Sequence, residues 1–260
     1  MNNFTEITSK DNQIIKFVSQ LQTSTKQRRT NGLFVLEGLR ICRDAYENGI
    51  KFEKLIVTKD AFNKHFDIID MFKTVSDNCY VLRDELFKKI SDTNTPQGII
   101  AVAKIPELST KISNCGRYIA VENIADPSNL GAISRTAEAL GVSGIIVSLD
   151  GCDPYSPKSL RASMGTLLRM PVYVTDDIIK FIKENSLRSL ACVVDCNAQS
   201  IADVDFRNGD VLLVGNEANG LTKETKEKSD TLVTIPMKGK TESLNAAVAA
   251  SIAMWEMMKK

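Results

Sequence analysis

Residues 118–148 have the sequence YIAVENIADPSNLGAISRTAEALGVSGIIVS. Two short apolar runs, 118–121 and 144–148, flank a polar turn and a segment, 129–140, whose apolar residues recur at helical spacing. The order strand, helix, strand predicts two parallel strands joined by a helix. Because polar residues do not alternate with apolar ones in either run, we expect a parallel sheet that is covered on both faces.

The same alternation of strands and helices extends along most of the chain. After residue 148 we expect strands at 171–174, 189–194, 211–214 and 232–235, and helices at 156–166, 178–184 and 243–258. Before residue 105 we expect strands at 33–36, 54–57, 79–82 and 99–103, and helices at 37–48, 61–76 and 84–89. The segment 105–114 contains a proline and interrupts this pattern. The sequence therefore predicts two α/β domains, a small α/β/α sandwich at 1–109 and a parallel-sheet domain at 110–260.

The composition is that of a folded globular protein and excludes a disordered or coiled-coil chain. Of the 260 residues, 43% are hydrophobic and 25% are charged, with 33 Lys and Arg against 32 Asp and Glu. A net charge of +1 creates no overall field that attracts a polyanion, so nucleic-acid binding needs a local patch. Lys26, Arg28 and Arg29 form a basic cluster that is either a solvated helix end or a phosphate-binding patch.

Other patterns exclude several classes of protein. The longest weakly polar stretch, 244–255, is shorter than the roughly 20 residues that a membrane helix needs. Six scattered cysteines and the lack of a signal-peptide pattern favour a cytoplasmic protein. His65 is the only histidine and lies apart from acidic or cysteine clusters, so we expect neither a catalytic triad nor a metal site. The glycine patterns of P-loop and Rossmann nucleotide sites are absent as well.

Polar residues gather after three of the predicted strands, where open parallel sheets bind their ligands. The first segment, 122–137, contains Asn129 and Arg135, which taken alone are explained as a helix cap and a surface charge. The second segment, 211–221, carries Gly-Asn-Glu at 215–217 and taken alone is an ordinary turn. In such a turn a glycine lets a ligand approach the main chain closely.

The third segment, 235–249, leads from a proline-containing loop into a helix rich in alanine and valine. We expect Ser243 and Asn245 in the first turn of that helix, with Asn245 directed back toward the other loops. Helix capping explains Ser243, but it does not explain Asn245. Three such segments in this order are much less probable by chance than any one of them.

Together the three segments resemble the SpoU family of RNA 2′-O-ribose methyltransferases, within the knotted SPOUT superfamily. Residues 156–165, Ser-Pro-Lys-Ser-Leu-Arg-Ala-Ser-Met-Gly, are a fourth matching segment, and the resemblance covers roughly 118–260. The N-terminal half resembles the substrate-binding domain that often precedes this module, through Phe34-Val-Leu-Glu37-Gly38-Leu-Arg40 and the basic cluster at 26–29.

This resemblance implies S-adenosylmethionine (AdoMet) as the methyl donor, bound beside a C-terminal trefoil knot. The positions that match the family's main-chain contacts to the donor are Gly215, Ile235 and Leu244. The resemblance further implies that Arg135 acts on the ribose hydroxyl, and that the site is shaped by Asn129, Glu217, Ser243 and Asn245. Because an arginine ordinarily keeps its proton, we expect Arg135 to bind the neighbouring phosphate and position the hydroxyl rather than act as a base.

The resemblance also implies structured RNA as the substrate and a homodimer as the active form. Ribosomal RNA, most simply 23S rRNA, is the expected target, with transfer RNA as the alternative. We expect RNA contacts from Lys26, Arg28, Arg29, Arg40 and Arg135. The apolar segment 244–258 is expected at the dimer interface, unless it is the core helix of a monomer. A catalytically idle RNA-binding protein of this fold and an unrelated α/β nucleotide enzyme are the remaining alternatives.

Overall fold

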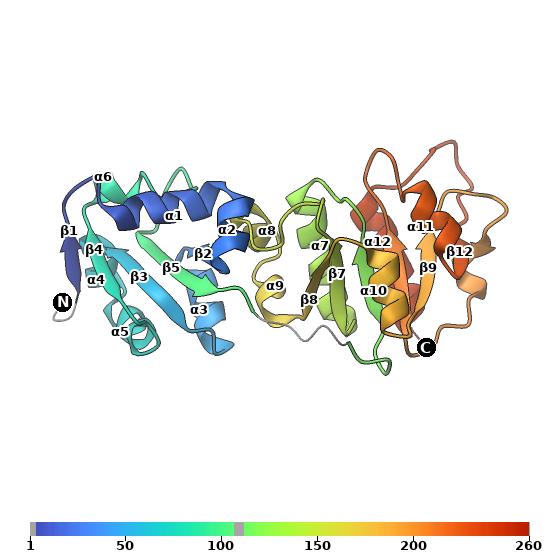
Figure 1. Ribbon diagram of the computed structural model, residues 1–260, viewed down its shortest axis with the longest axis horizontal. Coiled ribbons are helices and arrows are strands. Elements are labelled where there is room, and N and C mark those ends of the chain that lie inside the picture. Colours follow the sequence, from blue (N-terminus) through green and yellow to red (C-terminus); the bar gives the residue numbers. More distant parts are fainter. Residues whose placement is uncertain (1–3, 107–111, 260) are drawn as a thin grey trace. The chain divides into compact units, whose positions relative to one another are not determined.

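The computed structural model describes residues 4–106 and 112–259. Two compact units make up the chain, one from Met1–Glu107 with Tyr155–Arg161 and the other from Leu108–Pro154 with Ala162–Lys260. Each unit contains its own sheet (Figure 1). The predicted boundary between residues 109 and 110 lies outside the described residues. Residues 155–161, expected in the second domain, instead pack with the first unit.

The first unit is a three-layer α/β/α sandwich, as expected. Its sheet has the strand order β1 (Thr5–Ile7), β4 (Cys79–Leu82), β3 (Phe52–Thr58), β5 (Ile99–Lys104), β2 (Leu33–Glu37). Strand β5 is antiparallel to both of its neighbours, and the other pairs are parallel. One side carries α1 (Gln13–Thr23), α2 (Thr25–Asn31) and α6 (Asp84–Phe87), and the other carries α3 (Leu39–Glu47), α4 (Lys59–Lys64) and α5 (Phe66–Thr74).

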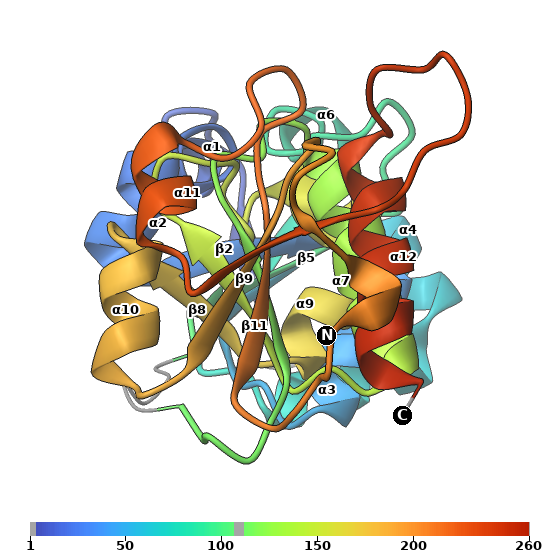
Figure 2. The ribbon, with the colours of Figure 1, turned by 90° about the vertical axis from the view of Figure 1, so that its right-hand side faces the viewer.

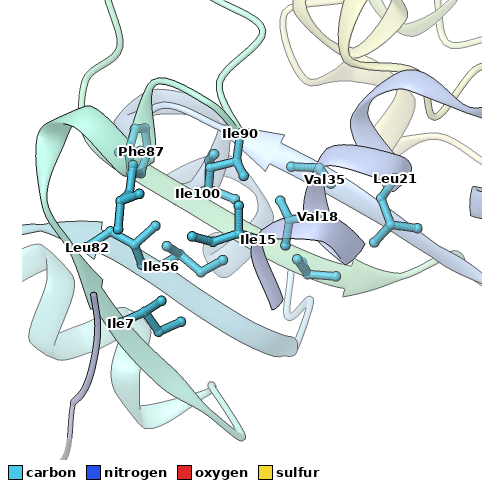
Figure 3. Packing of buried hydrophobic residues seen from close by; sticks show 12 residues of the cluster. Ile7, Ile15, Val18, Leu21, Val35, Ile56, Leu82, Phe87, Ile90 and Ile100 are labelled. Atoms are coloured by element: carbon cyan, nitrogen blue, oxygen red, sulfur yellow. The ribbon is translucent and has the colours of Figure 1, made fainter. Parts of the chain in front are cut away.

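Helix α1 supplies much of the core on its side of this sheet. Ile15, Val18 and Leu21 lie three residues apart on one face of the helix and are at most 4% exposed. They pack over buried strand residues that include Ile56 and Ile100 (Figure 3). Full burial of each such side chain contributes about 1.5–3 kcal/mol to folding. Helix α1 is therefore a main stabilising element of this unit.

The second unit contains a wholly parallel sheet, which confirms the expected fold class. Its strand order is β10 (Gln199–Ser200), β12 (Thr231–Thr234), β9 (Arg188–Cys192), β11 (Asp210–Val214), β6 (Tyr118–Val121), β7 (Gly144–Ser148), β8 (Val172–Thr175). Helices α7 (Pro127–Leu140) and α12 (Ala246–Met258) cover one face, and α10 (Ile178–Glu184) and α11 (Lys223–Lys228) cover the other (Figure 2). The chain passes from β12 in the sheet to α12, which lies on the face that α7 also covers.

Three predicted helices differ from the structure by more than a small shift of their ends. The helix expected at 61–76 is divided at His65 into α4 and α5. The helix expected at 156–166 consists of α8 (Pro157–Ala162) and α9 (Thr166–Arg169), separated by Met164 and Gly165 with positive φ. The closing helix begins at Ala246 rather than at Ser243. Helices α1, α2 and α11 were not predicted. In the described part of the chain, the helices fall short of the length and apolarity that a membrane crossing requires.

Candidate active site

A cavity of about 510 Å³ opens at the carboxyl ends of the central parallel strands β9, β11 and β12. Its wall combines the end of β9, the whole loop after β11, the loop after β12 and the start of α12. The lining residues are Cys192–Asp195, Val214–Leu221, Lys226, Leu232, Thr234, Ile235, Met237, Glu242–Leu244, Ala246 and Ala249. Five of the predicted site residues, Gly215, Glu217, Ile235, Ser243 and Leu244, therefore share one hollow.

Gly215 lies where the loop after β11 folds back on itself. An added Cβ there would be 2.1 Å from both the carbonyl carbon of Gly220 and the amide nitrogen of Leu221. Asn216 closes this turn, because its backbone N–H donates to the Gly220 carbonyl at 3.1 Å and its carbonyl accepts from the Gly220 N–H at 2.9 Å. Only glycine permits this approach of two backbone segments at the cavity wall.

The first polar segment lies behind this wall and is connected to it by Glu217. The Glu217 carboxylate accepts hydrogen bonds from the backbone N–H groups of Ala125 and Asp126, both at 3.2 Å. It also accepts one from Asn129 Nδ2 at 2.8 Å. Asn129 is 8% exposed in the first turn of α7, where Asp126 rather than Asn129 is the N-cap. Asn129 therefore joins the two loops and does not cap the helix.

Asn245 connects the third segment to the same network. Its Oδ1 accepts from the N–H groups of Ala247 at 2.9 Å and Val248 at 3.2 Å, so Asn245 is the N-cap of α12. Its Nδ2 donates to Asn129 Oδ1 at 3.1 Å. Asn245 is therefore directed toward the other loops, as expected, and it also caps the helix. A continuous chain of hydrogen bonds runs from Asn245 through Asn129 to Glu217 and joins the three polar segments.

Glu217 stays ionised in this network. Burial alone would raise the pKa of its carboxyl, but the hydrogen bonds from Asn129 and from the backbone N–H groups outweigh burial and leave the pKa below its usual 4.5. Since the folded-state pKa is lowered, the stabilisation from these bonds is complete above pH 4.5 and is lost only as the pH falls through the lowered value. At neutral pH the loops remain joined by a charged acceptor.

Arg135 has a different environment from the other predicted catalytic residues. It is exposed on α7, beyond the residues that line the cavity. Among the described residues, its side chain has no hydrogen-bond or ion-pair partner. Thr136 beside it shares a hydrogen bond of 3.1 Å with Ser251, so this part of α7 lies against α12. The Arg135 side chain is therefore accessible to solvent and lies apart from the cavity lining.

The predicted RNA-binding residues divide into two groups. Arg28 is 3% exposed, and its guanidinium donates to the carbonyls of Leu21 at 2.6 Å and Gln22 at 3.2 Å. It caps the end of α1. The prediction that Arg28 contacts RNA phosphates is therefore wrong, because a buried guanidinium that is bound to carbonyls cannot reach a phosphate. Lys26, Arg29 and Arg40 are exposed and keep that access.

Sequence analysis missed the wall formed by the end of β9 and the residues after it. Cys192–Asp195 line the cavity but carry no recognisable motif. Their position at the carboxyl end of a central parallel strand was the one available signal. Within the described residues, no group of three or more His, Cys, Asp and Glu side chains could hold a metal ion.

Comparison with known proteins finds relatives for both units. The model of the SpoU rRNA Methylase family matches residues 116–255, and that of the MRM3-like substrate binding domain matches 12–101. An uncharacterized tRNA/rRNA methyltransferase of Synechocystis is 30% identical over 98% of this chain and 93% of its own length. The Bacillus subtilis 23S rRNA (guanosine(2553)-2′-O)-methyltransferase RlmP is 29% identical over 97% and 98%. An AdoMet-bound rRNA methyltransferase from Sinorhizobium meliloti matches with a TM-score of 0.85 at 27% identity, covering 99% of this chain and 98% of that one.

Proposed function

The chain belongs to the SpoU rRNA methylase family, whose model matches more than half of it, and we propose that it methylates a ribose 2′-hydroxyl of 23S ribosomal RNA with AdoMet as donor. The observation that carries this proposal is the joining of the three family segments at one cavity through Asn245, Asn129 and Glu217. Two relatives aligned along nearly their whole length, RlmP and the Sinorhizobium enzyme, are rRNA methyltransferases by name. The proposed location is the cytoplasm.

The cavity residues fit AdoMet, which supplies an electrophilic methyl group on a sulfonium. Gly215 contributes main-chain atoms to the wall, and the half-buried Ile235 and Leu244 offer apolar surface for a purine. Among the lining side chains, Asp195, Glu217 and Glu242 are acidic and only Lys226 is basic. This acidic excess suits a donor whose sulfonium and ammonium groups outnumber its single carboxylate.

Arg135 is the proposed catalytic residue on the acceptor side. A guanidinium keeps its proton, so it binds the phosphate beside the target ribose through paired N–H groups and holds the hydroxyl in line with the methyl group. Ser243 at the cavity wall and Asn129 behind it are proposed to fix the surrounding loops. The reaction then depends mainly on alignment, which rigid loops provide without further reorganisation.

A homodimer would bring Arg135 to a cavity. Val248, Ile252 and Trp255 are 47%, 37% and 59% exposed along α12, beside the helix that carries Arg135. Such an apolar stripe on a helix that is already packed against its own unit favours burial against a second copy. We propose that Arg135 of one chain serves the cavity of the other. Complementation between two inactive variants tests this arrangement.

The first unit is proposed to hold the RNA through exposed cations. We expect Lys26→Glu with Arg29→Glu to weaken rRNA binding about 10-fold or more and to lower the slope of log affinity against log salt by about 2, because two phosphate contacts are lost. Arg40 is proposed to add to the same surface. Filter binding at several salt concentrations measures both quantities.

The matched control is Lys51→Glu with Lys64→Glu, which makes the same change of charge at two exposed lysines elsewhere in this unit. Equal weakening of rRNA binding by both double variants would show that the effect follows from the net charge of the unit. It would contradict direct RNA contacts from Lys26 and Arg29. The affinity for AdoMet should remain unchanged in both.

The function itself is tested by calorimetry and by methyl incorporation. We expect purified protein to bind AdoMet and to transfer its labelled methyl group to unmodified 23S rRNA, with the label located at a ribose. Absence of binding heat would contradict the methyltransferase proposal. Binding with transfer only to tRNA would replace the proposed substrate, and binding of both AdoMet and rRNA without transfer would leave an idle RNA-binding protein.

A further inference from the structure

Glu122 is a buried carboxylate that the catalytic scheme does not use. It follows β6 directly and is 8% exposed. Its carboxylate accepts hydrogen bonds from the backbone N–H of Thr222 at 2.7 Å, from the hydroxyl of the same residue at 3.2 Å, and from the hydroxyl of Thr225. Every donor comes from a segment about 100 residues later in the chain.

These donors form the start of α11. They come at the end of the loop after β11 (residues 215–222), here called the cavity loop because it lines the cavity. Thr222 is the N-cap of α11, and its hydroxyl also accepts from the Thr225 N–H at 3.2 Å. The residues on either side, Leu221 and Lys226, line the cavity. Glu122 therefore fixes the position at which the cavity loop ends and the helix begins.

The other end of the same loop is also fixed, but here the loop itself carries the carboxylate and the segment after β6 supplies the donors. Glu217 belongs to the cavity loop and binds the segment after β6, through Ala125, Asp126 and Asn129. Asn216 adds a bond from its Nδ2 to the Asn123 carbonyl at 2.8 Å. Each loop thus provides one carboxylate to the other, and residues 216–222 are held at both ends.

Stability alone does not account for a carboxylate at position 122. Taking a charge out of water is costly, and apolar side chains of similar volume often stabilise a core at least as well. Three directed hydrogen bonds, in contrast, select a single arrangement of the loop. The loop so fixed contains Gly215 and Leu221, whose backbone groups face each other at the cavity wall.

We infer that Glu122 is a positioning residue for the methyl donor, which it serves by holding the 221–226 side of the cavity; this inference rests on the proposed function. Glu217 holds the other end of the same loop and also binds the start of α7, which carries Arg135. Loss of Glu122 should impair donor affinity.

The test uses Glu122→Gln in the full chain, with AdoMet affinity measured by calorimetry and steady-state kinetics on 23S rRNA. We expect Kd and KM for AdoMet to rise about 10-fold, because a neutral amide with one acceptor oxygen cannot replace a charged acceptor of three bonds. At saturating AdoMet, kcat should stay within about twofold of the wild type. A general loss of structure would lower kcat and would not be overcome by AdoMet.

Asp230→Asn is the matched control. Asp230 accepts from the Ser189 N–H at 2.8 Å and the Ser189 hydroxyl at 2.6 Å, at the ends of β9 and β12 away from the cavity. The same change from carboxylate to amide should leave KM for AdoMet unaltered there. An equal rise of KM in this control, or an unchanged KM in Glu122→Gln, overturns the inference.

Thr225→Val decides the matter if Glu122→Gln does not fold. It removes one of the three hydrogen bonds to Glu122, together with the bond that Thr225 accepts from the Thr222 hydroxyl at 3.0 Å, at nearly constant volume. KM should therefore rise in the same direction by a smaller factor. A wild-type KM in this variant would also overturn the inference. Failure of the wild-type protein itself to bind AdoMet would instead refute the proposed function, so the two failures remain distinguishable.

Discussion

Replacing Gly215 with alanine is expected to raise the Kd for AdoMet more than about 100-fold. The added Cβ would lie 2.1 Å from two backbone atoms, the carbonyl carbon of Gly220 and the amide nitrogen of Leu221. A flexible side chain can move away from a methyl group, but a closed backbone turn cannot without opening. The turn would lose its Asn216–Gly220 bonds, and the cavity would lose its wall.

Calorimetry with AdoMet measures this effect, and circular dichroism establishes whether the variant is folded. Gly239→Ala is the control: Gly239 lies in the loop after β12, where a Cβ would meet no heavy atom within 4 Å. That variant should bind AdoMet within about twofold of the wild type. A folded Gly215→Ala protein with wild-type affinity would show that the proposed donor does not depend on this turn.

The fold was predictable where local pattern and tertiary environment agree. The strands at 118–121 and 144–148 have the expected bounds, because apolar runs inside a parallel sheet leave few alternatives. The helix at 178–184 also has the expected bounds. Strand β1 is only three residues long and is defined by its pairing with β4, which no local pattern reveals. Helix α1 was missed although its apolar residues recur at helical spacing.

The closing helix shows why capping residues are difficult to place from sequence. Ser243 and Asn245 are both good N-caps, and the prediction began the helix with the first of them. The structure begins it after Asn245, which caps with its oxygen and binds Asn129 with its nitrogen. The Asn245 amide satisfies both requirements, because its oxygen accepts and its nitrogen donates, but the second requirement comes from a residue 116 positions away.

The candidate site was predictable to the extent that it follows from strand ends. The rule that ligands bind at the carboxyl ends of parallel strands indicated the segments of the site. The three donor positions implied by the family resemblance, Gly215, Ile235 and Leu244, all line the cavity. Side-chain environment was not predictable in the same way. Arg28 and Arg29 are adjacent in the sequence, yet the first is buried against carbonyls and the second is exposed.

Replacing Arg135 with alanine is expected to lower kcat for rRNA methylation by about 10² to 10³, the range typical for loss of one preorganised charged donor. The Kd for AdoMet should stay within a few-fold of the wild type, because Arg135 lies outside the cavity lining. Arg135→Lys should recover only part of the rate, since a lysine keeps the charge and loses the paired geometry. Methyl incorporation under saturating AdoMet gives these rates.

Arg207→Ala is the control for Arg135→Ala. Arg207 is exposed in the same unit, and its backbone N–H and carbonyl bond to Asp210. This variant should methylate rRNA at the wild-type rate. An Arg135→Ala enzyme that also kept that rate would exclude Arg135 from the mechanism.

Mixing the two inactive variants is expected to restore activity if Arg135 acts on the cavity of the partner chain. In a mixed dimer, the Arg135→Ala chain keeps an intact cavity and the Gly215→Ala chain supplies the missing arginine. Equal mixing with free exchange makes about half of the dimers mixed, and each has one complete site of two, so about a quarter of wild-type activity should return. If Arg135 serves its own chain, or if the protein is a monomer, neither chain contains a complete site and the mixture stays inactive. Activity in the mixture therefore tests the dimer and the role of Arg135 together, because both are needed to build one working site from two damaged ones.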